Sequence, residues 1–87
     1  MSALIIYVYI LENPAGRLYI GQTSDLSSRL DDHNSTGPVQ GKFTRKNGPW
    51  RLLWTESHLS RSSAVLRERQ IKSWKSARTI RERLLAR

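Results

Sequence analysis

Residues 4–22 read LIIYVYILENPAGRLYIGQ, and this stretch decides the fold. Residues 4–12 alternate and are rich in Ile, Val and Tyr, the turn residues NPAG follow, and residues 17–22 alternate again. Two such segments joined by turn residues predict a β-hairpin. Pro14 suits the first central position of a type I turn, and Gly16 suits the left-handed residue that closes a three-residue loop with a bulge.

The length of this loop fixes which side chains share a face of the hairpin. A three-residue loop pairs Tyr9 with Gly21 and Leu11 with Tyr19, which places both tyrosines on one face. A slip of one residue would send the tyrosines to opposite faces. The other face then carries the apolar side chains of Val8, Ile10, Leu18 and Ile20. The prediction that the two tyrosines share a face therefore depends on the turn type.

A helix is predicted directly after the hairpin, over residues 25–33, with Thr23 or Ser24 as its cap. One face of this helix carries residues at i, i+3, i+4 and i+7, namely Leu26, Arg29, Leu30 and His33. Arg29 and His33 therefore border the apolar stripe, one turn apart.

The segment that follows, residues 34–49, is rich in Gly, Ser, Thr, Asn and Pro and predicts a loop. Its tip is basic, because it carries Lys42, Arg45 and Lys46. We expect such a loop to contact the backbone of a nucleic acid.

The rest of the chain adds a strand and two helices to the hairpin. Residues 50–56 alternate and predict a third strand, and helices are expected over residues 62–74 and 77–86. The inner stripe of the first of these helices is Ala64, Ile71 and Trp74. Together the elements predict a small α/β (α+β) domain spanning residues 1–87, in ββαβαα order, with a three-stranded, mainly antiparallel sheet flanked by helices.

Charge is distributed unevenly along the 87 residues, which carry a net charge of +8. Residues 1–40 hold a net charge of −2, whereas residues 41–87 hold +10. A basic half of this kind favours a polyanionic partner, with a merely solvated surface as the alternative. An anionic membrane surface is disfavoured, because no predicted helix pairs a basic face with a broad apolar one.

Composition narrows the class of protein further. The chain has no cysteine, which excludes disulfides and thiolate metal sites. The apolar run 4–11 is too short to span a bilayer and lacks a preceding basic region. We therefore expect a cytoplasmic protein.

Taken alone, each candidate residue has an ordinary structural role. Tyr9 and Tyr19 would form a cross-strand aromatic pair. Arg29 and His33 would cover the edge of the core with their stems. Glu68 would form an ion pair with Arg61, Arg67 or Lys72. His58 has no partner that the sequence identifies.

The order and spacing of these residues resemble the GIY-YIG nuclease superfamily. In that family two tyrosine-bearing motifs on a hairpin precede a helix with Arg and His or Tyr, and a later helix carries a metal-binding Glu. The matching motifs are Tyr7-Val8-Tyr9, of which only the final tyrosine is kept, and Tyr19-Ile20-Gly21. The resemblance runs from Tyr7 to Lys75 and is closest to small stand-alone members similar to the catalytic module of the excision-repair nuclease subunit.

The resemblance implies roles for individual residues. Tyr9, Tyr19, Arg29 and His33 match the catalytic positions, Glu68 matches the metal ligand, and Lys42 matches a position that is basic or His. No Asn follows Glu68, although several members use one to support the site. The implied activity is a Mg²⁺- or Mn²⁺-dependent endonuclease acting on DNA, branched or nicked forms included, in repair or processing.

The chemistry of phosphodiester cleavage suits these residue types. Mg²⁺ is often held by one or two carboxylates while it keeps several waters, so a single Glu68 is enough. Arg29 offers a planar fork to phosphate oxygens. Tyr9 is expected to activate water if Arg29, Lys42 and the metal lower its pKa, with Tyr19 orienting water or phosphate and His33 assisting proton transfer.

Further residues are expected to hold the substrate. Gly21 is expected to leave room for a phosphate near the backbone. The expected nucleic-acid-binding residues are Lys42, Arg45, Lys46, Arg67, Lys72 and Lys75.

Two other functions fit the same sequence. The first is a nucleic-acid-binding module that has the fold without cleavage, which predicts salt-sensitive binding with little dependence on Glu68. The second is a protein-interaction domain whose basic face meets an acidic partner.

Overall fold

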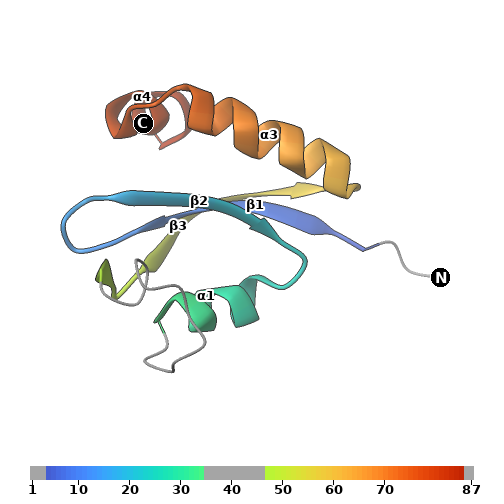
Figure 1. The fold of residues 1–87 in the computed structure, drawn as a ribbon, viewed down its shortest axis with the longest axis horizontal. Helices are drawn as coiled ribbons and strands as arrows, with labels where there is room; N and C mark the ends of the chain where they lie inside the picture. Colours follow the sequence, from blue (N-terminus) through green and yellow to red (C-terminus); the bar gives the residue numbers. More distant parts are fainter. Residues whose placement is uncertain (1–3, 35–46, 86–87) are drawn as a thin grey trace.

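The computed structural model describes residues 4–34 and 47–85. These residues form a three-stranded antiparallel sheet in the order β2-β1-β3, with α1 against one face and α3 and α4 against the other (Figure 1). The strands are β1 (Ile6–Glu12), β2 (Leu18–Thr23) and β3 (Arg51–His58). The helices are α1 (Leu26–Asn34), α3 (Arg61–Ser73), α4 (Ala77–Ile80) and the π-helical turn η1 (Arg81–Leu85). The predicted α+β class and three-stranded sheet are confirmed, and both strand pairs are antiparallel.

The hairpin has the predicted register. Tyr9 pairs with Gly21 and Leu11 with Tyr19, so the two tyrosines share a face. Gly16 closes the loop at φ 82°, a left-handed conformation that a residue without a Cβ adopts at little cost.

Asn13 holds the loop together from within. Its backbone N–H donates to the Arg17 carbonyl at 3.0 Å, and its side-chain oxygen accepts from the N–H groups of Ala15 and Arg17 at 3.1 and 2.8 Å. Asx side chains favour turns because they can satisfy backbone donors in this way. This bonding explains why Asn13 is buried at the end of a strand.

The two faces of the sheet support two separate cores. The face under α3 and α4 buries mainly aliphatic residues, which are Ile6, Val8, Ile10, Ala64, Ile71 and Ile80. The face over α1 buries Tyr9, Leu11 and Trp50, with Tyr19, Leu26 and Leu30 packed against them. The predicted inner stripe of α3 is confirmed, since Ala64 and Ile71 are fully buried and Trp74 packs against them. The aromatic residues and the first helix therefore occupy the same face.

The cap of α1 differs from the prediction. The side chain of Asp25, and not of Thr23 or Ser24, accepts the N–H of Ser28 at 3.1 Å. Thr23 instead accepts the N–H of Asp25 at 3.0 Å. These bonds to Ser28 hold the pKa of Asp25 below its ordinary value. The Thr23 hydroxyl therefore does not cap α1 itself but holds in place Asp25, the residue that caps the helix.

The C-terminal helix also departs from the prediction of one helix over residues 77–86. The α-helical part ends at Ile80 and the π-helical turn η1 follows. Arg81, the first residue of η1, donates to the Gly16 carbonyl at 2.9 Å and pairs with Glu12 at 2.7 Å. Through these contacts Arg81 connects η1 to the hairpin. Helix propensity depends on neighbouring residues in the chain, so it could not predict a contact with residues this distant in the sequence. Within residues 4–34 and 47–85, no helix has the length and apolar character that crossing a membrane requires.

Candidate active site

Tyr9 crosses the hairpin and lies over Gly21 of the neighbouring strand. A Cβ added at Gly21 would meet the Tyr9 hydroxyl oxygen at 2.5 Å and Cζ at 2.7 Å. The expectation that Gly21 leaves room for a substrate phosphate is therefore wrong, because the tyrosine ring fills that space. Since β2 is an edge strand, the absence of a side chain at Gly21 lets the Tyr9 hydroxyl reach the edge of the sheet.

A hydrogen bond joins Tyr9 to the helix that follows the hairpin. The Tyr9 hydroxyl and His33 Nε2 are 3.1 Å apart, and both residues are buried, at 3% and 6% exposure. The Tyr19 ring meets the edge of the His33 ring with centroids 4.5 Å apart and stacks near Tyr9 at 6.4 Å. Trp50 closes the cluster, with its ring 6.1 Å from that of Tyr19. The structure thus brings three of the four predicted catalytic residues into direct contact.

The surroundings of Tyr9 favour its neutral form. Burial is the main cause that raises the pKa of Tyr9 above its ordinary value of 10.0, and the nearby Tyr19 adds to it. The positive charge of Arg29 lowers this pKa, while the negative charges of Glu68 and Asp32 raise it. The expected lowering by Arg29 is present, but burial outweighs it.

His33 is shifted toward its neutral form as well. Burial lowers the pKa of His33 below its ordinary value of 6.5, and the charge of Arg29 lowers it further against an opposing effect of Asp32. At neutral pH the bond between Tyr9 and His33 therefore joins a neutral phenol to a neutral imidazole.

Arg29 lies beside Tyr9, where its positive charge could bind an anion. It is an exposed residue of α1, lines a pocket of about 120 Å³ together with Tyr9, and acts electrostatically on both Tyr9 and His33. Within residues 4–34 and 47–85, neither a hydrogen bond nor an ion pair engages its guanidinium. Its planar fork is thus available to a phosphate next to the tyrosine.

Glu68 comes from the other face of the sheet. It belongs to α3, which packs on the face opposite α1 (Figure 1). Its charge still raises the pKa of Tyr9, because the Tyr9 hydroxyl lies on the edge strand beside which α3 packs. Its partner is Lys72, whose Nζ donates to Oε2 at 2.6 Å. The site therefore joins the two faces around one edge of the sheet.

The donor set fits a hydrated magnesium-type ion better than a fully protein-ligated one. Among the residues that the structure describes, no group of three or more His, Cys, Asp or Glu gathers around a common point. Mg²⁺ keeps most of its waters and is commonly held by one or two carboxylates plus substrate phosphates. Glu68, whose side chain is 18% exposed, meets that requirement, with Lys72 sharing one of its oxygens.

Of the predicted nucleic-acid-binding residues, the three that the structure describes lie on different sides of α3. Lys42, Arg45 and Lys46 lie outside the described residues. Arg67 turns toward β3, where it pairs with Glu56 at 3.0 Å and lies over the Trp54 ring. Lys72 and Lys75 lie on the other side of α3, facing β2. Arg67 therefore belongs to the packing of α3 on β3, and of the three described residues the two lysines are the ones beside Glu68 and β2.

Two clusters were not predicted from the sequence. The Asn34 side chain clamps the backbone of Trp50, donating to its carbonyl at 2.9 Å and accepting its N–H at 2.6 Å. This pair of hydrogen bonds fixes the Trp50 ring that packs on Tyr19. In the sequence, the position of Asn34 directly after His33 was the one feature that could have suggested a role for Asn34 in the site.

His58, which the sequence left without a partner, is bonded through both ring nitrogens. Nδ1 lies 2.5 Å from the Ser63 hydroxyl and Nε2 lies 2.8 Å from Glu56. These bonds join the end of β3 to the first turn of α3, and Arg67 completes the cluster through Glu56. The histidine helps to set the direction of α3.

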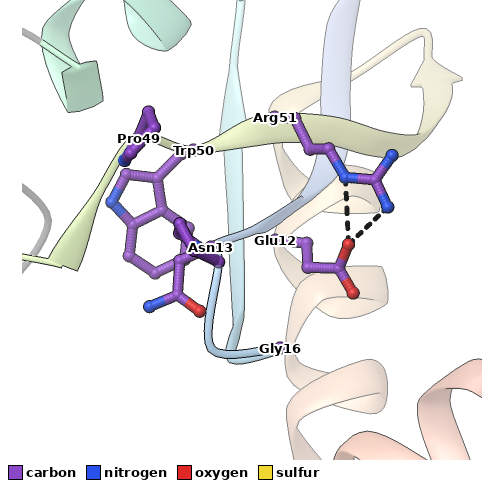
Figure 2. A pocket seen from close by; sticks show the side chains of 7 residues that line it. Glu12, Asn13, Gly16, Pro49, Trp50 and Arg51 are labelled. Atoms are coloured by element: carbon purple, nitrogen blue, oxygen red, sulfur yellow. Dashed lines mark hydrogen bonds and ion pairs between the residues drawn. The ribbon is translucent and has the colours of Figure 1, made fainter.

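A larger pocket, of about 430 Å³, lies at the hairpin end of the sheet (Figure 2). Figure 2 shows Trp50 and Asn13 on one side and Glu12 facing Arg51 on the other. The carboxylate of Glu12 is already engaged, by Arg51 at 2.6 Å and by Arg81 at 2.7 Å. Hydrogen bonds from these arginines lower the pKa of Glu12. Among the described residues that line this pocket, the only carboxylate is therefore already paired with two arginines.

Comparison with known proteins identifies similar chains. Residues 5–81 match the model of the GIY-YIG catalytic domain. The chain is 41% identical over 71 residues to a UPF0213 protein of Syntrophus aciditrophicus, a match covering 82% of this chain and 80% of that protein. It is 36% identical over 81 residues to a UPF0213 protein of Staphylococcus aureus, covering 88% and 95%. The solution NMR structure of a UPF0213 protein from Bacillus halodurans is 38% identical, with a TM-score of 0.49 over 79% of this chain and 71% of that one.

Proposed function

Because the chain belongs to the GIY-YIG catalytic domain family, a family of nucleases, we propose that it hydrolyses phosphodiester bonds in DNA with Mg²⁺ or Mn²⁺. We place this activity in DNA repair or processing. The observation that carries the proposal is the buried hydrogen bond between Tyr9 and His33, on which the charges of Arg29 and Glu68 both act at Tyr9. These supply a proton relay, an anion-binding group and a metal ligand around one hydroxyl group.

Arg29 binds the phosphate. Its fork is planar and permanently charged, so it can donate two parallel hydrogen bonds to phosphate oxygens. A phosphate in that position lies beside the Tyr9 hydroxyl. The phenol and the guanidinium then contact the same reacting group from the same face of the sheet.

Tyr9 and His33 move the proton. Ionising Tyr9 by transfer to His33 is unfavourable, because burial raises the pKa of Tyr9 from its ordinary 10.0 and lowers the pKa of His33 from its ordinary 6.5. A free tyrosinate is therefore avoided. With its own proton on Nδ1, His33 accepts the Tyr9 proton at Nε2 while the Tyr9 oxygen accepts one from the attacking water. His33 is the final base, and it is neutral and ready at pH 7.

Glu68 would hold the metal, which would neutralise charge on the phosphoryl oxygens and stabilise the leaving oxygen. Tyr19 packs its ring against His33 and so keeps the imidazole oriented toward Tyr9. Trp50 and its clamp by Asn34 support Tyr19 from behind. The imidazole of His33 is thereby held in place by Tyr19, Trp50 and Asn34, which transfer no proton themselves.

The test is cleavage of nicked, branched and single-stranded DNA by the purified protein with Mg²⁺ or Mn²⁺. Tyr9→Phe is expected to lower the rate by at least about a hundredfold, the lower bound for a positioned proton-transfer group. Glu68→Ala is expected to lower it by about as much or more, because a bound metal contributes several kcal/mol of charge stabilisation. The matched control is Tyr7→Phe, which removes a hydroxyl two residues away on the same strand. Cutting that survives both site substitutions would contradict the proposal.

A second function, nucleic-acid binding without cleavage, is favoured by one observation. Glu68 is already paired with Lys72, and Tyr9 is only 3% exposed, so both catalytic groups are engaged without substrate. This alternative predicts binding that weakens with salt and is unchanged by Glu68→Ala or by a metal chelator. Metal-dependent cutting that is lost in Glu68→Ala excludes it.

A further inference from the structure

Cationic side chains follow the edge of the sheet on both sides of Glu68. Along α3 the positions i, i+4, i+7 and i+11 form one stripe, which consists of Arg61, Val65, Glu68 and Lys72, and Lys75 follows just after the end of the helix. The stripe runs beside β2, because Arg61 donates to the Gln22 side chain at 2.9 Å. Three cations thus follow one strand edge, with the proposed metal ligand between them.

An open groove lies at the end of this stripe, between β2 and the two C-terminal helices. Its volume is about 230 Å³. The apolar lining consists of Leu18 and Ile20 from β2 and Ala77 and Ile80 from α4, and the polar lining consists of Lys72, Lys75 and Ser76. An apolar floor beside two ammonium groups is complementary to a sugar-phosphate backbone, whose deoxyribose faces are apolar and whose phosphates are anionic.

Lys75 has a backbone conformation that its residue type disfavours. Its φ is 61°, and within the described residues it is the only non-glycine residue with a positive φ. It lies just after the end of α3, where its N–H donates to the Lys72 carbonyl at 3.2 Å. Gly is the usual residue at such a helix end, because it has no Cβ to strain. The helix end therefore does not require a lysine, and a strained residue of this kind commonly marks a functional position.

We propose that this groove, lined by Lys72 and Lys75, binds the phosphodiester backbone of the DNA strand beside the point of cleavage. Lys72 connects the groove to the site, because it contacts Glu68 at 2.6 Å while lining the groove. A strand in the groove therefore lies beside Glu68 of the candidate site. The assignment of the strand to the cleaved substrate rests on the proposed nuclease function, whereas the binding itself does not.

Two variants of Lys75 separate its charge from its backbone strain. Lys75→Gly removes both, so it is expected to raise the thermal midpoint of unfolding while it weakens DNA binding. Lys75→Gln removes the charge and keeps the strain, so it should weaken binding without raising the midpoint. The control is Arg78→Gln, which removes one charge from the neighbouring α4 at an exposed position that does not line the groove.

Binding is measured by the fluorescence anisotropy of a labelled oligothymidylate, without metal, over a series of salt concentrations. Loss of one phosphate contact lowers the salt slope for a single strand by about 0.7, which is about a fivefold loss of affinity at 0.1 M salt. Both Lys75 variants should show this loss, and Arg78→Gln should show much less. The proposal is overturned if both Lys75 variants bind like Arg78→Gln, or if the unaltered protein does not bind the probe.

The outcomes distinguish this proposal from the nuclease. If affinity falls in both Lys75 variants but the protein never cuts, the groove is supported and the nuclease function fails. If Glu68-dependent cutting is observed but the Lys75 variants bind normally, the nuclease function is supported and the groove fails.

Discussion

Gly21→Ala is expected to destabilise the fold by displacing Tyr9 from the candidate site. The added methyl carbon would lie 2.5 Å from the Tyr9 hydroxyl oxygen and 2.7 Å from Cζ, well inside the separation of about 3.5 Å that non-bonded atoms prefer. The tyrosine has little room to yield, because it is 3% exposed and its hydroxyl is bonded to His33. The methyl group and the hydrogen bond therefore cannot both be kept.

The expected cost has two parts. Overpacking a filled core position costs about 1 to 3 kcal/mol, and loss of one buried hydrogen bond costs a further 0.5 to 1.5 kcal/mol, roughly. A total of about 2 to 4 kcal/mol is a large share of the 5 to 15 kcal/mol typical of whole domains. For a chain of this size it corresponds to a fall in thermal midpoint on the order of 10 °C or more.

Urea denaturation of a double-mutant cycle tests the reasoning. In a Tyr9→Ala background there is no ring for the methyl group to meet, so Gly21→Ala should cost less than about 0.5 kcal/mol. The difference between the two backgrounds measures the clash itself. If Gly21→Ala costs the same with and without the tyrosine ring, the cost comes from the backbone of β2, and a clash with Tyr9 is refuted as its cause.

Two further predictions concern protons and metal. Because the folded state lowers the pKa of His33, the unfolded state binds the proton more tightly, so stability is present above pH 6.5 and is lost as pH falls below it. Urea midpoints at pH 7 and pH 5 should therefore differ less in His33→Gln than in the unaltered protein, and an equal loss in both would contradict the prediction. Lys72→Gln removes the ammonium that is paired with Glu68 at 2.6 Å, so it should tighten Mn²⁺ binding, followed by electron paramagnetic resonance without DNA, by about two- to fivefold. Glu68→Gln should abolish that binding, and unchanged or weaker binding in Lys72→Gln would count against Glu68 as the ligand.

The sequence predicted the parts of the fold whose causes are local. The register of the hairpin follows from Pro14 and Gly16, and it fixes the shared face of Tyr9 and Tyr19. The inner stripe of α3 follows from spacing alone, since Ala64 and other buried residues recur at helical intervals. In each case the residues that decide the structure are near one another in the chain.

What the sequence did not predict depends on the direction in which individual side chains turn. The partners of His58, Glu56 and Ser63, are close to it in the chain, but their contact depends on how β3 meets α3. The cap of α1 was misassigned because Thr23, Ser24 and Asp25 are all good capping residues, and only the structure shows which one turns toward Ser28. Spacing in the sequence identifies residues that could form a given hydrogen bond, but only the direction of each side chain in the structure shows which of them forms it.

Of the side chains whose direction the sequence did not predict, Tyr9 has the largest effect on the candidate site. Pairing with Gly21 was predicted, but the sequence did not show that the ring would lie across the glycine and carry the hydroxyl to the edge of the sheet. From that edge the hydroxyl is influenced by Arg29 on one face and Glu68 on the other. A larger residue at position 21 would hold the ring back and separate it from the charge of Glu68 by the thickness of the sheet. The glycine of the second motif is therefore part of the candidate site because it lets residues from both faces act on one hydroxyl group.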